Sequence, residues 1–177
     1  MSLSCIEAIK QRRSIRQYST KEVPREVLME IIQSALRAPS AGNLQPWHIY
    51  VVTDQQKKIA LAQAALGQRF VQEAPVVLVV CAEPERSAAR YGARGRELYC
   101  LQDTANLTYA IMLAATSYGL GTCWVGAFQE QGVQETLGLD SGRRPVAIIP
   151  IGYPEKIGAE RPRRGVEEIV SFVDGQE

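Results

Sequence analysis

Two segments near the start of the chain repeat apolar side chains every three or four residues. The first opens at Ser4-Cys5-Ile6-Glu7 and runs to about Arg13, and the second follows Pro24 and stops before Pro39. This spacing places the apolar side chains on one face of a helix. Proline is favoured at the first position of a helix and terminates one when it follows. The pattern therefore predicts two amphipathic helices.

Other segments do not show apolar side chains at the helical spacing of three or four residues. Residues 75–82 are almost continuously apolar, which is typical of a strand buried on both faces, and residues 47–52 are β-branched and aromatic. Further strands are predicted at 122–128 and 145–153. Further helices are predicted at 55–66, 98–118 and 131–139, with a short apolar segment at 165–173.

The helix over residues 98–118 is the longest one predicted. Its residues 109–115 are apolar all round, so we expect it to be buried on every side, in the core and at a subunit interface. The strands do not alternate regularly with the helices, which favours an α+β architecture over a doubly wound sheet. We expect residues 1–177 to form a single domain.

Composition narrows the possible functions. The 177 residues carry a net charge of +1, so no overall field attracts nucleic acid or an anionic membrane. The most apolar stretch, residues 107–120, is too short to span a bilayer and the first 14 residues do not resemble a signal peptide, so a cytoplasmic location is expected. With His48 as the only histidine and four scattered cysteines, no metal site is expected. An enzyme this poor in catalytic side chains would need a cofactor.

Arginines gather in two short segments near opposite ends of the chain. Arg12, Arg13 and Arg16 surround Ser14, and a second cluster holds residues 161, 163 and 164. The planar guanidinium binds phosphate oxygens in pairs, and a serine hydroxyl adds a donor. The clusters could be solvated surface, or they could converge on one dianion. The glycines of residues 119–126 match neither the dinucleotide-binding nor the P-loop pattern.

Four segments, in this order and spacing, resemble the nitroreductase superfamily. They are RRSIR at 12–16, APSAGNLQPW at 38–47, GLGTCWVG at 119–126, and RPRR at 161–164 followed by EEIV at 167–170. The resemblance implies an α+β fold with a central mixed β-sheet flanked by helices. It also implies an intertwined homodimer in which two chains share two FMN sites at their interface.

The resemblance further implies which residues bind FMN. Those on one chain are Arg12, Arg13, Ser14, Arg16, Val125, Gly126, Arg161 and Arg163. Those contributed by the partner subunit are Pro39, Ser40, Ala41 and Asn43. Arg16 is expected near the N1/O2 edge of the flavin, where its charge favours the reduced form, and a backbone N–H of residues 125–126 is expected near N5.

The function implied is that of an FMN-dependent NAD(P)H oxidoreductase. Hydride would pass from NADH or NADPH to the flavin, and then two electrons to a nitroaromatic, a quinone or a similar small acceptor, with no catalytic side chain required. The alternatives are another flavin reaction of the superfamily (reductive dehalogenation, enone reduction or substrate oxidation), a flavin-binding storage or sensor protein, or a flavin-free interaction protein. Residues 84–97, rich in arginine and small residues, are expected to form a mobile lid over the substrate.

Overall fold

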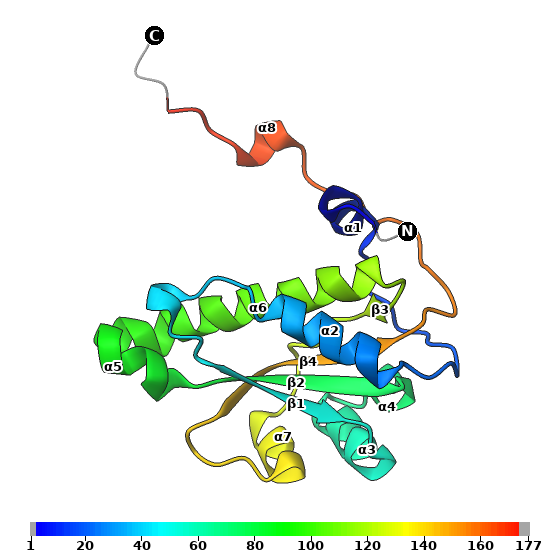
Figure 1. Ribbon diagram of the computed structural model, residues 1–177, viewed down its shortest axis with the longest axis horizontal. Helices are drawn as coiled ribbons and strands as arrows, with labels where there is room; N and C mark the ends of the chain where they lie inside the picture. The colour runs from blue at the N-terminus through cyan, green and yellow to red at the C-terminus, as the bar shows by residue number, and fades with distance from the viewer. Residues whose placement is uncertain (1–2, 174–177) are drawn as a thin grey trace.

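A computed structural model describes residues 3–173 of the chain (Figure 1). Its helices are α1 Cys5–Gln11, α2 Arg25–Ala35, α3 Gln55–Ala64, α4 Phe70–Glu73, α5 Pro84–Arg94, α6 Cys100–Ser117, α7 Glu130–Leu137 and α8 Val166–Ile169, with short helical turns η1 at Ala41–Asn43 and η2 at Gly95–Tyr99. Its strands are β1 Trp47–Val52, β2 Val76–Ala82, β3 Gly121–Thr122 and β4 Arg144–Gly152.

The four strands form one sheet in the order β1-β2-β4-β3, and every neighbouring pair is antiparallel. Within residues 3–173, only the bridge between Ser14 and Thr122 runs parallel. The predicted α+β class is therefore confirmed, and the mixed character of the sheet is limited to this bridge. The strand predicted over 122–128 is shorter than expected, because after Thr122 only Val125 pairs with β4, through Ile148.

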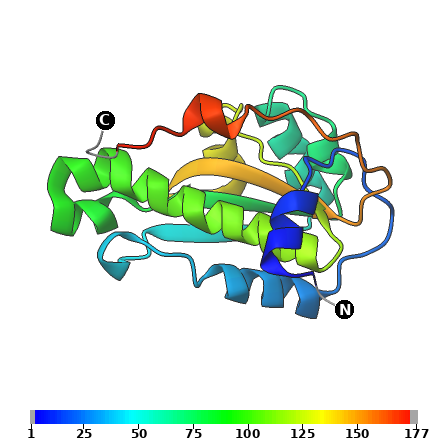
Figure 2. The same cartoon turned by 90° about the horizontal axis from the view of Figure 1, so that it is seen from above.

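Helices cover both faces of the sheet (Figures 1 and 2). Along β2, residues Val76, Leu78 and Val80 pack with α2 and α6 in one apolar cluster, while the alternate residues 77, 79 and 81 pack with α3, α4 and α7 in another. Every residue of β2 is buried. The continuous apolar pattern thus reflects a central strand with helices on both sides, as predicted.

The first arginine cluster lies outside the helix that precedes it. The Ser4 hydroxyl accepts a hydrogen bond from the Glu7 N–H, and the Glu7 carboxylate accepts from the Ser4 N–H, which caps α1 at its start. The helix ends at Gln11, two residues before the predicted end, and Arg12 has the non-helical ψ of 126°. Residues 12–16 then run beside β3, where the Ile15 N–H donates to the Thr122 carbonyl at 2.9 Å.

Three further regions can be compared with the expectation. In α6, Ile111 and Met112 are buried but Tyr109 is 42% exposed, so this helix is not buried on every side within one chain. Residues 84–97, expected to form a mobile lid, fold as α5 and the start of η2, and their role as a lid stays a prediction. The C-terminal segment with α8 stands clear of the layers, with exposed apolar side chains that include Phe172 (Figure 1). No helix among residues 3–173 is long and apolar enough to cross a membrane.

Candidate functional site

A cavity of about 650 Å³ lies where the segment after α1 meets the segment after β4. The residues that line it are Arg12, Arg13, Ser14, Arg16, Gly158, Ala159, Glu160, Arg161, Pro162 and Arg163. The structure therefore brings together two arginine clusters that are almost 150 residues apart in sequence. The sequence left open whether the clusters are solvated surface or converge, and in the structure they converge on one cavity.

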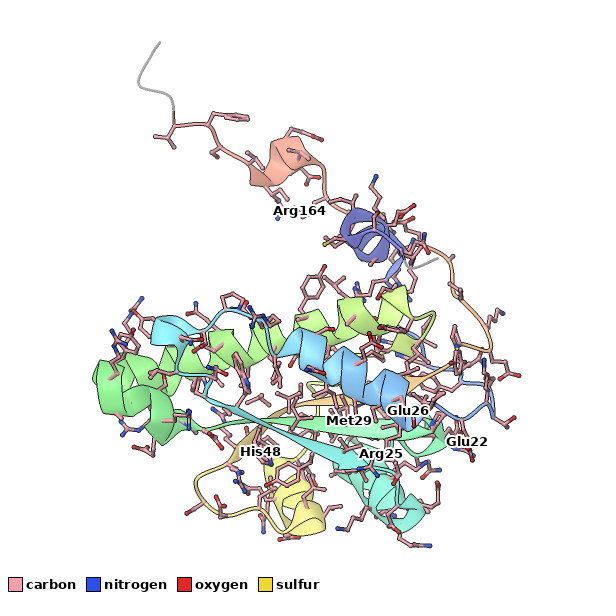
Figure 3. All side chains as sticks on the ribbon, viewed as in Figure 1. Glu22, Arg25, Glu26, Met29, His48 and Arg164 are labelled. Atoms are coloured by element: carbon pink, nitrogen blue, oxygen red, sulfur yellow. The ribbon has the colours of Figure 1, made fainter. Side chains whose placement is uncertain are left out.

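The charge of this cavity is strongly unbalanced. Five arginines and one glutamate line it, and the glutamate, Glu160, pairs with Arg13 at 2.9 Å. None of the other four arginines forms an ion pair within residues 3–173. Arg164, labelled in Figure 3, instead lies beside α8 and donates to the Glu168 carbonyl at 2.9 Å. The cavity is thus suited to a dianion such as a phosphate monoester.

Residues 12–16 leave helical geometry at Arg12 and bridge to β3 through Ser14, and four of them line the cavity. In an extended chain the two ends of such a segment lie roughly 13 Å apart. In a continued helix Arg12 and Arg16 would be only about 6 Å apart. The Arg16 guanidinium lies 5.7 Å from the centroid of the Phe70 ring. One end of the segment can therefore hold a phosphate while the other holds a group well separated from it.

Beneath this segment, β3 approaches closely because one of its residues lacks a side chain. A Cβ built on Gly121 would lie 2.5 Å from Cγ1 of Ile15, so only glycine permits this packing. Cys123, the residue after β3, is buried. Burial raises the pKa of its thiol by more than the nearby Arg16 and Ser14 lower it. Cys123 is therefore a neutral thiol and not a nucleophile at neutral pH.

The two residues expected near the flavin ring differ in their backbone hydrogen bonds. The N–H of Val125 donates to the Ile148 carbonyl at 2.9 Å, and the side chain is 2% exposed. The N–H of Gly126 has no hydrogen-bond partner within the described part of the chain, and the residue is exposed. Of this pair, only Gly126 has a backbone donor available for a ligand.

The loop of residues 39–45 is held in an unusual conformation by its neighbours. Gly42, Asn43 and Gln45 have φ values of 57°, 55° and 50°, a region that costs non-glycine residues free energy. The Gln45 N–H donates to the Ser40 hydroxyl at 3.0 Å, and the Ala41 N–H donates to a carboxylate oxygen on α6 at 3.0 Å. These hydrogen bonds fix the loop before any ligand arrives.

This loop does not reach the arginine cavity of its own chain. It contacts α6 near Asp103, whereas β3, which bridges to Ser14, lies at the C-terminal end of α6, roughly 20 Å along the helix from Asp103 (Figure 1). Within one subunit, the FMN site expected from the sequence is therefore divided. The eight residues expected from one chain are separated from the four of this loop, which are Pro39, Ser40, Ala41 and Asn43. His48, labelled in Figure 3, lies on β1, away from the cavity, with its ring 4.7 Å from that of Tyr50.

Two acidic residues of this region were not expected from the sequence. Glu160 lines the cavity, and Asp103 anchors the loop through Ala41. Asp103 is 4% exposed, its Oδ2 has no hydrogen-bond partner among residues 3–173, and burial raises the pKa of its carboxyl group. A charged residue inside the mostly apolar helix 98–118 was the available signal, because a buried carboxylate requires a specific partner.

Known proteins share both the sequence and this fold. The sequence profile of the nitroreductase family matches residues 9–69 and 63–153. An NADH dehydrogenase of Thermus thermophilus is 36% identical over 187 residues, covering 90% of this chain and 91% of that protein. An FMN reductase (NAD(P)H) of Bacillus subtilis is 30% identical over 179 residues, covering 93% and 71%. The solved structure of the NADPH:FMN oxidoreductase of Vibrio harveyi complexed with NAD+ superposes with a TM-score of 0.88, at 30% identity, covering 98% and 78%.

The family profile extends over most of the chain. Its matched residues include the first arginine cluster, the 39–45 loop and Gly126, and they end before the second arginine cluster. The similarity to relatives covers nearly the whole of this chain and most of each relative. This chain belongs to the nitroreductase family.

Proposed function

We propose that this chain is an FMN-dependent NAD(P)H oxidoreductase that works as a homodimer. The observation that carries the proposal is the convergence of both arginine clusters and Ser14 on one cavity. Relatives named as an FMN reductase and as an NADPH-flavin oxidoreductase support the same cofactor.

The phosphate end of FMN would lie against the arginines. Arg12, Arg161 and Arg163 have no ion pair within residues 3–173, so their guanidinium N–H groups can donate to phosphate oxygens. Ser14 lines the same cavity, and its hydroxyl adds a donor. Arg13 is held by Glu160, which fixes the cavity wall formed by residues 158–163.

The ring end would lie toward Arg16 and Gly126. When bound, FMN supplies the redox chemistry, taking hydride from a reduced nicotinamide and passing two electrons to an organic acceptor such as a nitroaromatic or a quinone. The Arg16 guanidinium would place positive charge at the edge of the flavin ring, and the Gly126 N–H would orient the ring. His48, the only histidine, lies away from the cavity, so no imidazole acid or base is assigned.

A second copy of the chain would complete the site. The 39–45 loop is preformed, and it lies about one helix length from the cavity of its own chain. Tyr109 on α6 and the apolar side chains of the C-terminal segment are exposed in the single chain, and burying them between two copies would be favourable. We therefore infer that each FMN contacts the arginine cavity of one subunit and the loop of the other.

The test starts with the purified protein. We expect it to be yellow, to release FMN rather than FAD on denaturation, to scatter light as a dimer of the 19.5 kDa chain, and to oxidise NADH or NADPH when menadione or a nitrofuran is added. A colourless protein that binds no added FMN would overturn the proposed function. Bound FMN without any turnover would indicate a flavin-binding protein instead.

A further inference from the structure

Helix α5 and turn η2 carry four arginines, of which two have structural partners. Arg96 forms a bidentate pair with Glu85 at 2.7 and 2.8 Å, and the Arg86 side chain donates to the Leu44 carbonyl. The other two, Arg90 and Arg94, are exposed and form no ion pair within residues 3–173. These two cations have no anionic partner among residues 3–173 and are available to a ligand.

Each of these two arginines rests on a tyrosine. The Arg90 guanidinium carbon lies 5.4 Å from the centroid of the Tyr91 ring, and that of Arg94 lies 5.3 Å from the Tyr99 ring. Arg94 Nε also donates to the Tyr99 hydroxyl at 2.9 Å, and the two tyrosine rings pack edge to face with centroids 5.2 Å apart. Stacking restrains a guanidinium and leaves most of its N–H groups free for an oxyanion.

A sharp turn of the chain assembles this cluster. Gly92 has φ 57° and ψ −142°, so α5 is interrupted there and η2 folds back along it. A Cβ on Gly95 would lie 2.5 Å from the Ser87 carbonyl oxygen, which shows how closely the two segments pack. The turn brings Tyr99 onto Tyr91, and each of these two rings carries one of the arginines.

The cluster adjoins the loop that we assign to the flavin site. A Cβ built on Gly42 would lie 2.6 Å from the Tyr91 hydroxyl oxygen and 2.8 Å from Arg90 Nη1. If the proposed function holds, the Gly42 loop completes a flavin site of the partner subunit. This contact then puts Arg90 and Tyr91 at the rim of that site.

We propose that Arg90, Tyr91, Arg94 and Tyr99 form a substrate subsite for an anionic group, a carboxylate or phosphate, on a molecule that approaches the flavin over the Gly42 loop. The two tyrosine rings provide apolar surface, and the guanidinium groups beside them provide charged hydrogen-bond donors. Two sources share this chemistry. One is the carboxylate of an aromatic electron acceptor, and the other is the 2′-phosphate of NADPH.

The test compares substrates that differ only in the anionic group. The variant is R90Q/R94Q, and the matched control is Arg25→Gln, an exposed arginine at the start of α2 on the opposite end of the molecule (Figure 3). One arm measures kcat/KM for 4-nitrobenzoate relative to 4-nitrobenzamide with NADH. The other measures kcat/KM for NADPH relative to NADH with 4-nitrobenzamide. Titration calorimetry of the oxidised protein with 4-nitrobenzoate and with NADP+ measures binding without turnover.

We expect one of the two ratios, and the binding of the corresponding anion, to fall about tenfold in R90Q/R94Q and to stay unchanged in Arg25→Gln. A lower nitrobenzoate ratio assigns the subsite to the acceptor, and a lower NADPH ratio assigns it to the nicotinamide. Turnover with both ratios and both affinities unchanged would overturn the subsite and leave the proposed function standing. A protein that reduces neither acceptor fails the proposed function, and the calorimetric arm then decides the subsite alone.

Discussion

The arginine cavity and the 39–45 loop lie toward opposite ends of α6 and are built in opposite ways. The cavity is open and cationic, and four of its five arginines form no ion pair within residues 3–173. The loop carries no charged residue. Its Ala41 and Gln45 N–H groups donate to Asp103 and Ser40, and Arg86 donates to its Leu44 carbonyl. Its positive φ values at Gly42, Asn43 and Gln45 are maintained by those contacts.

This difference suggests a division of roles between the two regions. Unpaired arginines repel one another, so an anionic ligand stabilises the cavity as it binds. The loop requires no ligand to order it, because its conformational cost is met by contacts with α5 and α6. We interpret the cavity as the source of affinity for the phosphate and the loop as a preformed wall offered to a partner subunit.

The largest expected effect comes from removing one arginine of each cluster. R12A/R163A should lose two charge-assisted hydrogen bonds to the phosphate, weakening FMN binding by about 3–5 kcal/mol, or roughly 10²–10⁴ in Kd. Fluorescence titration of the flavin-free protein measures this. Arg164→Ala is the control, because Arg164 pairs with Glu168 and does not line the cavity. Equal losses in both proteins would mean that the effect is one of general charge.

A methyl group on Gly42 tests whether the loop is preformed. Gly42→Ala should destabilise the fold by about 1–3 kcal/mol, since alanine is strained at this φ and its Cβ requires the ends of the Tyr91 and Arg90 side chains to move. Gly67→Ala is the matched control, with φ 75° and open space around the added carbon, and should cost about 1–2 kcal/mol. Urea unfolding gives both values. Identical costs would show that the contact with α5 does not restrain the loop.

Asp103 links the loop to α6, and its ionisation gives a pH signature. Burial raises the pKa of its carboxyl group above the unfolded value, so the folded state disfavours the charged form and stability falls as pH rises from about 4 through that raised pKa. Asp103→Asn should flatten this slope while keeping an acceptor for the Ala41 N–H. Asp103→Ala should cost about 1–3 kcal/mol at every pH, because it removes the acceptor. Urea midpoints measured across the pH range separate the two variants, and a slope unchanged in Asp103→Asn would remove Asp103 as its source.

The smallest expected effect separates the two ends of the 12–16 segment. Loss of a cation beside the ring should lower the two-electron potential of bound FMN by roughly 20–40 mV, corresponding to about 1–2 kcal/mol. Arg16→Ala should show this shift, while Arg12→Ala should weaken FMN binding and leave the potential unchanged. Redox titration of each protein saturated with FMN makes the comparison. A shift in Arg12→Ala alone would mean that the two roles are reversed.

The sequence predicted best where one physical signal dominates. Strand β1 was predicted at its observed bounds and β2 within one residue. Runs of apolar and β-branched side chains favour a buried strand whatever the rest of the chain does. The end of α1 was placed too late, because Ser14 is drawn into a bridge with Thr122, more than 100 residues away. Local propensity carries no information on such a partner.

The candidate site was predictable by residue type and not by arrangement. Arginine and serine identified the candidate phosphate-binding segments, but their convergence depends on the path of residues 153–163 after β4. The helix over Pro84–Arg94 was missed because small and charged residues with a glycine are typical of loops. The anchor from Asp103 to Ala41 joins residues 62 apart and has no local signature.

The central claim, that two chains share each flavin site, is tested most directly by the flavin content of a mixed dimer. One chain carries R12A/R163A and the other Asn43→Ala, each with its own affinity tag, and the heterodimer is isolated by both tags from a mixture refolded with FMN. Each variant homodimer should hold little flavin, whereas the heterodimer retains one site with a native cavity and a native loop. We predict one FMN per heterodimer. A heterodimer as empty as its parents would contradict the account, because each site would then belong to a single chain.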